Sequence, residues 1–172
     1  NPDTGEYVWH YQQVPGESWD YTAAQQMSLM DIQWQGEQRK VMVQATKAGF
    51  FYILDRVTGE LLSAEKFVHA NWASHYDLQT GRPVESPGKR YLGEPATVFP
   101  TGMGGHNWRS MSYSLITGLY YIPALDMGSE FIAIKPEDFK LLRRHWNLGY
   151  NIDGAAMSEP MQQAMMKQLP QA

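Results

Sequence analysis

Short apolar runs rich in aromatic residues alternate with tight polar turns along most of the chain. Residues 50–53 form one such run, and the turn at 55–59 that follows it reads Asp-x-x-Thr-Gly. Similar Thr-Gly turns lead into the apolar runs 7–11 and 119–124. Because a glycine at the end of such a turn accepts a positive φ, the pattern predicts β-hairpins. The Thr-Gly pairs lie at residues 4–5, 58–59, 80–81 and 117–118.

The repeated strand–turn–strand frame predicts an all-β chain that forms part of a β-propeller, with about two four-stranded antiparallel blades. The strands of a first, complete blade are expected near residues 23–30, 39–45, 50–55 and 60–66. Those of a second, partly complete blade are expected near residues 109–114, 118–124, 131–135 and 141–146. Residues 68–108 are expected to form a long connection rich in Gly and Pro. A connection of this length is too long to be a simple turn between two strands.

The two ends of the chain differ from this frame. The first turn appears at residue 3 with no strand before it, so we expect the chain to be a fragment of a larger propeller. The partial propeller domain is expected over residues 1–150. Residues 151–172 are rich in Met, and we expect them to be a short helix or disordered. The alternative architecture is a small β-sandwich in which the Thr-Gly turns recur by chance.

Composition excludes several classes of function. Aromatic residues make up 13% of the chain, and its 15 Gly and 10 Pro fit a turn-rich β protein. The net charge of −4 and the lack of a basic stripe argue against a nucleic-acid partner. Since the chain has no Cys, it has no disulfide, thiolate metal site, c-type haem attachment or cysteine nucleophile. The sequence contains no signal peptide and no apolar run near the length of a transmembrane segment.

Three motifs in this order resemble the pyrroloquinoline-quinone (PQQ) dependent quinoprotein alcohol dehydrogenases, in particular the quinohaemoprotein type. They are Pro-Gly-Glu-Ser-Trp-Asp-Tyr-Thr-Ala at 15–23, Ala-Thr-Lys-Ala-Gly-Phe-Phe-Tyr-Ile-Leu-Asp-Arg at 45–56 and Gly-Gly-His-Asn-Trp at 104–108. The resemblance extends to about residue 150. It implies an eight-bladed propeller that holds PQQ and a metal ion near its central axis.

The resemblance implies site roles for four residues. Asp20 matches the catalytic aspartate and a metal ligand, and a carboxylate beside a divalent cation can accept the hydroxyl proton of an alcohol. Lys47 matches the basic residue that binds the carbonyl oxygens of the quinone, where a fixed positive charge stabilises a developing oxyanion. Asn107 and Trp108 match a pair that lines the cofactor pocket. The amide offers hydrogen bonds there, and the indole offers a flat apolar wall.

Each of these residues also has an ordinary structural interpretation. Asp20 alone would cap a turn, and Lys47 alone would be a solvated turn lysine. Asn107 and Trp108 would be a loop amide beside a core aromatic. His106 lies beside the site motif but is not assigned to the metal, and the other histidines share no ligand spacing. The functional interpretation therefore depends on the resemblance.

The resemblance implies a periplasmic enzyme that oxidises alcohols to aldehydes or ketones by hydride transfer to PQQ, with Asp20 as general base. It also implies an electron acceptor such as a cytochrome c domain or protein. Calcium is the expected metal, because Thr22 stands where lanthanide-using relatives have a second aspartate.

The other metal ligands, the tryptophan that stacks on PQQ and any haem c would lie outside this chain. The isolated chain is therefore expected to be inactive. Two alternatives remain: a non-catalytic propeller scaffold and a PQQ-dependent sugar or polyol dehydrogenase.

Overall fold

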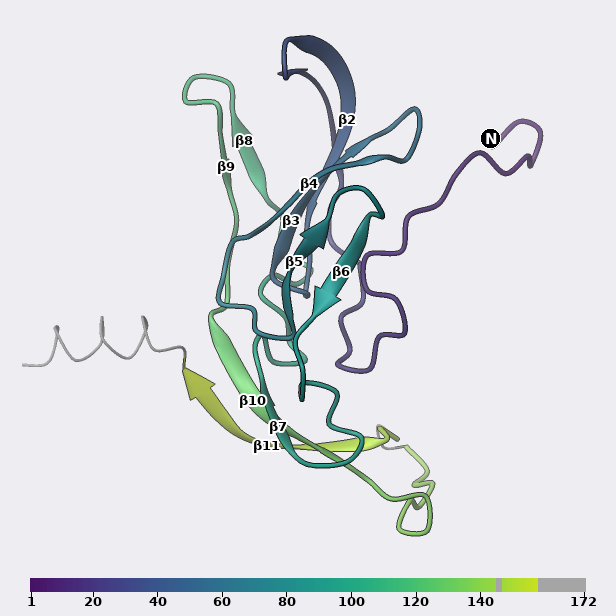
Figure 1. The fold of residues 1–172 in the computed structure, drawn as a ribbon, viewed down its shortest axis with the longest axis vertical. Coiled ribbons are helices and arrows are strands. Elements are labelled where there is room, and N and C mark those ends of the chain that lie inside the picture. The colour runs from purple at the N-terminus through teal and green to yellow at the C-terminus, as the bar shows by residue number, and fades with distance from the viewer. Residues whose placement is uncertain (145–146, 158–172) are drawn as a thin grey trace, which may run out of the picture.

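All regular secondary structure in the described part of the chain is β-strand, as the sequence predicts. The computed structural model describes residues 1–144 and 147–157. Its strands form two larger sheets, of four and three strands, and two separate hairpins (Figure 1). The described residues include no helix that could cross a membrane.

The four-stranded sheet is the predicted complete blade. Its strands pair in sequence order and are β1 (Ser28–Trp34), β2 (Glu37–Ala45), β3 (Phe50–Asp55) and β4 (Leu61–Lys66). Gln35 and Gly36 join β1 to β2 with φ of 51° and 89°, which is the positive-φ turn that two-residue hairpins favour. Gly59, from the Asp-x-x-Thr-Gly turn before β4, has a φ of 80°, in line with the prediction.

The first strand of this blade begins later than predicted. The side-chain amide of Gln44 donates to the carbonyls of Ala23, at 3.4 Å, and Gln25, at 2.7 Å. These bonds satisfy backbone groups that a neighbouring strand would otherwise bind. The expected strand near 23–30 is therefore wrong in its first half.

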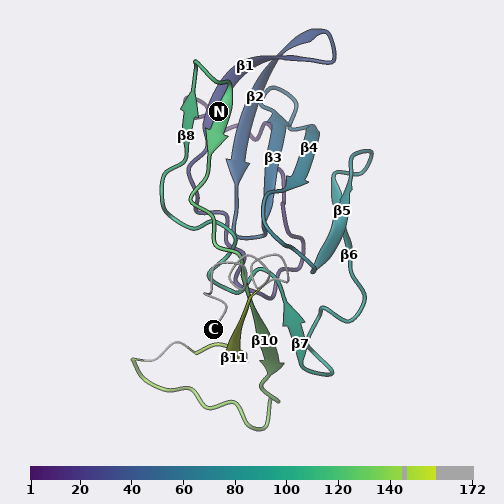
Figure 2. The ribbon, with the colours of Figure 1, turned by 90° about the vertical axis from the view of Figure 1, so that its left-hand side faces the viewer.

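The predicted second blade is wrong in its strand pairing. β8 (Ser112–Ser114) and β9 (Leu119–Tyr121) pair with each other, whereas β10 (Met127–Ala133) lies between β7 (Ala96–Val98) and β11 (Tyr150–Met157). The three-stranded sheet lies beyond the end of the first blade at which β2 turns into β3 (Figure 2). Residues 109–144 therefore contribute to two sheets rather than one.

Burial explains why β10 pairs with β7. Ala96 and Val98 are buried and Thr97 between them is exposed, so β7 offers two apolar side chains to the core. The register places Ala96 opposite Phe131 and Val98 opposite Ser129, and both β10 residues are buried. An alternation of only three residues is too short to predict a strand within a Gly- and Pro-rich connection.

The rest of the long connection and the C-terminal segment also depart from the expectations. The connection carries a hairpin of β5 (Ala73–Asp77) and β6 (Arg82–Glu85), closed by the Thr-Gly pair at 80–81. Residues 141–144 of the expected strand 141–146 are not in a strand. β11 crosses the expected boundary at residue 150, so the first part of the Met-rich segment is a strand. Residues 145–146 and 158–172 lie outside the described residues.

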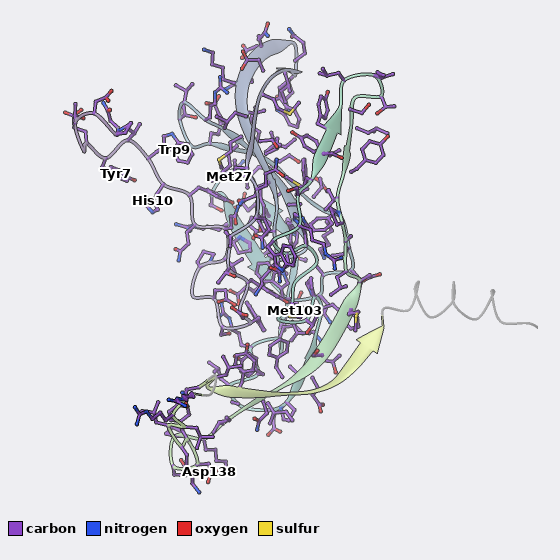
Figure 3. All side chains as sticks on the ribbon, turned by 180° about the vertical axis from the view of Figure 1, so that it is seen from behind. Tyr7, Trp9, His10, Met27, Met103 and Asp138 are labelled. Atoms are coloured by element: carbon purple, nitrogen blue, oxygen red, sulfur yellow. The ribbon has the colours of Figure 1, made fainter. Side chains whose placement is uncertain are left out.

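The main core is built from stacked and tilted aromatic rings. The ring centre of Trp19 lies 5.5 Å from that of Tyr21 and 5.4 Å from that of Trp72. The Trp72 indole N–H donates to the Ala48 carbonyl at 2.8 Å. These contacts join the loop before β1 to the turn after β2. Tyr7, by contrast, lies on an N-terminal arm that extends away from the sheets (Figure 3).

Buried tyrosines make the fold sensitive to alkaline pH. The hydroxyl of Tyr52 lies 2.7 Å from that of Tyr76, which donates to the Gln13 carbonyl at 2.6 Å. Burial raises the pKa of both hydroxyls well above the usual range. Burial, together with the negative charge of Asp20, raises the pKa of Tyr150 to about 12. Because the folded pKa exceeds the unfolded one, each hydroxyl stabilises the fold fully below about pH 10 and loses this effect as the pH rises further.

We expect the free energy of unfolding to be steady at mildly alkaline pH and to fall above about pH 10. The expected slope is about 1.4 kcal/mol per pH unit for each of the two buried tyrosines, Tyr52 and Tyr76, and smaller for Tyr150, whose charge is screened by solvent. Urea unfolding across this range measures it. Tyr76→Phe should make the slope shallower, whereas Tyr7→Phe, at a 74% exposed position, should not. A free energy of unfolding that stays flat well above pH 10 would contradict the assignment.

Candidate functional site

The structure brings Asp20 and Lys47 into contact. Lys47 lies in the tight turn between β2 and β3, where Gly49 has a φ of 83° and donates to the Thr46 carbonyl at 3.1 Å. The Lys47 Nζ donates to Asp20 Oδ2 at 2.9 Å and to the Asp20 carbonyl oxygen at 2.8 Å. The Lys47 side chain is 9% exposed and that of Asp20 is 50% exposed. A nearly buried ammonium therefore meets a carboxylate that opens to solvent.

The backbone around Asp20 is fixed on both sides. Asp20 has a φ of 67°, in a left-handed region that few residues other than Gly, Asn and Asp adopt. Its neighbours Trp19 and Tyr21 are buried. The Trp19 indole donates to the Lys89 carbonyl at 3.0 Å, and the Tyr21 hydroxyl donates to the Pro100 carbonyl. The buried neighbours therefore leave the Asp20 side chain as the one that projects from this turn.

Residues from the long connection at 68–108 also donate hydrogen bonds to the loop that carries Asp20. The Arg90 guanidinium donates to the Gly16 carbonyl and lies 4.5 Å from the centre of the Trp19 ring. The Tyr91 hydroxyl donates to the carbonyl of Ser18. The loop that carries Asp20 is thus bonded to a segment about 70 residues further along the chain.

The glycine pair of the third motif packs directly on Lys47. The Gly105 N–H donates to the Lys47 carbonyl at 2.9 Å. A Cβ on Gly104 would lie 2.3 Å from Lys47 Cγ and 2.5 Å from its Cα, and a Cβ on Gly105 would lie 2.5 Å from Val68 Cγ2. Gly104 also has a φ of 83°. These approaches require glycine at both positions.

His106 fixes the same loop to the end of β2. Its side chain is buried, and its Nδ1 lies 2.9 Å from the Ala45 carbonyl. Its Nε2 lies 2.7 Å from the Arg109 carbonyl. Both ring nitrogens are therefore used in backbone contacts, which gives His106 a structural role.

Asn107 and Trp108 follow this docked loop but make no hydrogen bond to Asp20 or Lys47 within the described residues. The Asn107 amide donates to the Met103 carbonyl at 2.9 Å, and its Oδ1 accepts from the Trp108 N–H at 2.9 Å. Both residues line a cavity of about 230 Å³, and Trp108 is 77% exposed. The close approach of Gly104 to Lys47 thus places this pair beside the Lys47 turn. The two residues nevertheless line a cavity whose lining does not include Asp20 or Lys47.

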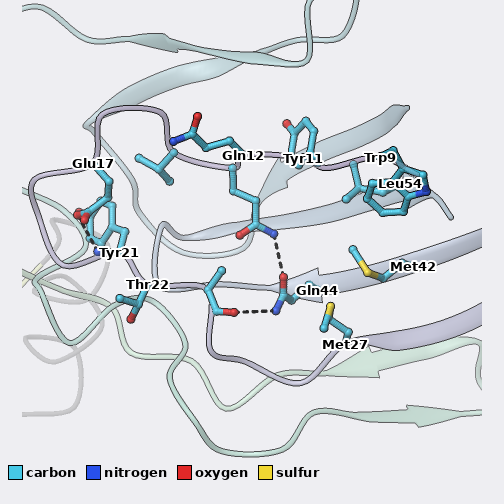
Figure 4. A pocket seen from close by; sticks show the side chains of 13 residues that line it. Trp9, Tyr11, Gln12, Glu17, Tyr21, Thr22, Met27, Met42, Gln44 and Leu54 are labelled. Carbon is cyan, nitrogen blue, oxygen red and sulfur yellow. Dashed lines mark hydrogen bonds between the residues drawn. The ribbon is translucent and has the colours of Figure 1, made fainter. Parts of the chain in front are cut away.

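A second cavity, of about 420 Å³, lies beside the Asp20 loop (Figure 4). Glu17, Tyr21 and Thr22 line it on the loop side, and Gln44 from β2 lines it on the sheet side. The Gln44 Oε1 accepts from the Gln13 amide at 2.8 Å, so its polar atoms are satisfied within the protein. Asp20 itself is not among the lining residues.

Two residues near Asp20 were not identified from the sequence. The carboxylate of Glu17 binds backbone N–H groups beside Asp20. Tyr150 from β11 lies near enough to Asp20 for the carboxylate charge to contribute to its raised pKa, although burial is the larger cause. Burial, followed by the charge of Glu17, also raises the pKa of Tyr21. Glu17 lies within the motif at 15–23, whereas nothing in the sequence connects Tyr150 with Asp20.

Near Asp20, the described residues supply one oxygen ligand for a hard cation but not a complete metal site. Within residues 1–144 and 147–157, no three His, Cys, Asp or Glu side chains form a group that could hold a metal ion. Asp20 offers a carboxylate on a half-exposed side chain, the type of ligand that calcium prefers. The chain can therefore contribute to an oxygen-ligated site but does not complete it with these residues.

Comparisons with a family profile and with curated proteins show what the chain is similar to. A family profile for the glucose/ethanol/alcohol dehydrogenase β-propeller domain, of the PQQ type, matches residues 1–70. The chain is 57% identical over 141 residues to quinohemoprotein alcohol dehydrogenase ADH IIB of Pseudomonas putida. This match covers 78% of the chain and 20% of that protein. The chain thus spans about a fifth of the length of the curated relatives it matches.

Solved structures give the same fold. The quinohemoprotein alcohol dehydrogenase of Comamonas testosteroni has a TM-score of 0.80 at 37% identity, over 92% of this chain and 24% of that one. A europium-containing methanol dehydrogenase has a TM-score of 0.79 at 35% identity, over 88% of this chain and 26% of that one. These matches, with the open antiparallel sheets, confirm the prediction of a partial propeller.

Proposed function

Because this chain belongs to the PQQ-dependent quinoprotein alcohol dehydrogenases, we propose that it supplies the general base and a cofactor-binding cation of an enzyme that oxidises alcohols to aldehydes or ketones. The observation that carries the proposal is the contact of Lys47 Nζ with Asp20, 27 residues apart in the chain. It joins a proton acceptor to a fixed positive charge, the two groups that removal of a hydride and a proton requires.

Asp20 takes the hydroxyl proton of the alcohol in this proposal. Lys47 holds its Oδ2 and its carbonyl oxygen, whereas Oδ1 makes no hydrogen bond within the described residues. Oδ1, on a side chain that is half exposed, is therefore the atom that accepts the proton. The Lys47 ammonium orients the carboxylate before the alcohol binds.

Lys47 has a second role toward the cofactor. Of the three N–H donors of its ammonium, two are used on Asp20. The third remains for a quinone oxygen, where the positive charge would stabilise negative charge that develops during the reaction. The near-complete burial of the side chain strengthens this interaction by excluding water.

Asn107 and Trp108 are proposed to line the cofactor site. The Asn107 amide has a second N–H beyond the one given to Met103, and the exposed Trp108 indole offers a flat apolar surface. When bound, PQQ supplies the acceptor for the hydride, and calcium, with Asp20 among its ligands, supplies a charge that favours the ionised alcohol. The docking of Gly104 on Lys47 supports a common site for the lysine and the loop.

The parent enzyme is proposed to act in the periplasm and to pass its electrons to a cytochrome c domain or protein. The test of the proposed function uses the full-length apo-protein. Adding PQQ and calcium should produce alcohol-dependent dye reduction, with primary or secondary alcohols as substrates. Two results would contradict the proposal: dye reduction only with a sugar or polyol, or no dye reduction with any of these substrates.

Thr22 supports calcium rather than a lanthanide. It lies two residues after Asp20, is exposed and carries a neutral hydroxyl, so it adds no negative charge for a trivalent ion. Calcium should therefore restore more activity to the metal-free protein than a light lanthanide at matched concentration. Thr22→Asp should shift the ratio of lanthanide to calcium affinity toward the lanthanide by about tenfold, or ~1.4 kcal/mol.

Metal affinity measured by titration calorimetry, together with turnover, checks this prediction. Thr117→Asp is the matched control, because Thr117 is an exposed turn threonine in the β8–β9 hairpin. It adds the same charge away from Asp20 and should leave the ratio unchanged. Higher activity of the unmodified protein with the lanthanide would overturn the choice of calcium.

A further inference from the structure

Glu17 bonds to the backbone on both sides of Asp20. Its Oε1 accepts a hydrogen bond from the Trp19 N–H and another from the Tyr21 N–H, the latter at 2.7 Å (Figure 4). It lies three residues before Asp20, and its side chain lines the cavity beside the loop. No ion pair to Glu17 is found in the described part of the chain. Its contacts therefore serve the conformation of the turn.

One of these bonds acts on the peptide group that Lys47 also holds. The Tyr21 N–H and the Asp20 carbonyl belong to the same trans peptide unit, so they point in opposite directions. The N–H donates to Glu17 and the carbonyl accepts from Lys47 Nζ at 2.8 Å. The plane of this peptide is thus fixed at both ends, and with it the direction in which the Asp20 side chain leaves the backbone.

The unusual backbone of Asp20 makes this restraint important. A φ of 67° is a sparsely populated conformation for a residue with a side chain, and it persists when surrounding bonds determine it. If the peptide rotated toward a commoner conformation, the Asp20 carbonyl and carboxylate would turn away from Lys47. Both atoms that bind Lys47 therefore depend on the turn that Glu17 holds.

The rest of the loop is held independently of Glu17. Arg90 donates to the Gly16 carbonyl and pairs with Glu85, and the Trp19 indole donates to the Lys89 carbonyl. Loss of the Glu17 carboxylate should therefore leave the loop docked and affect mainly the turn at Asp20.

We propose that Glu17 is a positioning residue that holds the Asp20 turn so that the Asp20 carboxylate and carbonyl both meet Lys47. The proposal rests on the function proposed above for Asp20. For this role the length of the Glu17 side chain matters more than its charge, because one oxygen must contact two N–H groups.

The experiment compares three substitutions in the full-length holoenzyme. Glu17→Gln keeps the reach and a carbonyl acceptor, Glu17→Asp keeps the charge but is one methylene shorter, and Glu17→Ala removes both. Small displacements of a reacting group cost up to roughly 100-fold in rate. We therefore expect kcat to fall roughly 10- to 100-fold in Glu17→Ala and Glu17→Asp, with little change in KM, and to be largely retained in Glu17→Gln.

Two further readouts separate positioning from general destabilisation. Amide hydrogen exchange of Tyr21 should accelerate in Glu17→Ala and Glu17→Asp but not in Glu17→Gln. Asp77→Ala is the matched control, because Asp77 also bonds a turn, through the Gln79 N–H at 2.9 Å, in another hairpin. It should leave kcat and the exchange of Tyr21 unchanged.

The Asp20 and Glu17 variants together distinguish the role of Asp20 from the positioning role of Glu17. If Asp20→Asn turned over like wild type, the proposed function would fail. If Asp20→Asn were inactive but Glu17→Asp kept the wild-type kcat and Tyr21 exchange, the positioning role alone would be wrong. In an Asp20→Asn background Glu17→Ala should cause no further loss, since Glu17 acts through Asp20, and an additive loss would overturn the inference.

Discussion

Replacing Asp20 by asparagine in the full-length protein is expected to lower turnover by about 10²–10⁴-fold while the fold is retained. An amide cannot accept the proton of the alcohol, but it matches the carboxylate in size. Asparagine also tolerates the φ of 67° that Asp20 adopts, and Lys47 can still donate to the backbone carbonyl of residue 20. Steady-state turnover with saturating PQQ and calcium, together with thermal unfolding, measures both effects.

Asp31→Asn is the matched control for this substitution. Asp31 is 49% exposed, close to the 50% of Asp20, and it pairs with Arg56 at 3.2 Å as Asp20 pairs with Lys47. Asp31→Asn removes one charge from a comparable surface pair. Asp31 lies in β1, away from the proposed reaction centre. Turnover of Asp20→Asn near that of Asp31→Asn would remove Asp20 from the mechanism.

Gly104→Ala is expected to destabilise the fold by about 2–5 kcal/mol and to weaken PQQ binding. An alanine in the left-handed region costs about 1–2 kcal/mol, and overpacking in a tight contact costs about 1–3 kcal/mol more. Both apply, because Gly104 has a φ of 83° and its new Cβ would lie within 2.5 Å of Lys47 backbone and side-chain atoms. Urea unfolding and PQQ titration of the full-length apo-protein measure the two effects.

Gly36→Ala separates the two causes. Gly36 has a similar φ of 89°, but a Cβ there would meet nothing within 4 Å. It should therefore cost only the conformational part, about 1–2 kcal/mol, and leave PQQ affinity unchanged. Equal destabilisation by both substitutions, with equal PQQ affinity, would show that the contact of Gly104 with Lys47 does not matter.

Three of the four strands of the complete blade were predictable because their signals are local. β2 and β3 carry apolar runs at 41–43 and 50–54, and Gly59 closes the Asp-x-x-Thr-Gly turn before β4. β7 was missed because three residues are too few to show a period, and its partner β10 lies about 30 residues further along the chain. Pairing between distant strands depends on which faces are buried, and a local pattern does not contain that information.

The residues of the candidate site come from the sequence, whereas their geometry comes from the structure alone. The motifs that resemble the family point to Asp20 and Lys47. The structure shows that these two residues are in contact, with Lys47 Nζ 2.9 Å from Asp20 Oδ2. The role of Glu17 depends on a single positive φ at Asp20, which an aspartate in a loop does not reveal. The docking of Gly104 on Lys47 joins segments 57 residues apart, and it follows from tertiary packing alone.

The most direct test of this account is a crystal structure of the full-length protein with PQQ and calcium bound. It should show the calcium ion on the carboxylate of Asp20 and a quinone oxygen of PQQ within hydrogen-bond distance of Lys47 Nζ. The contact of Lys47 with Asp20 should persist. A cofactor bound with its quinone oxygens away from Lys47, or a metal site that excludes Asp20, would contradict the assignment of this pair as the reaction centre.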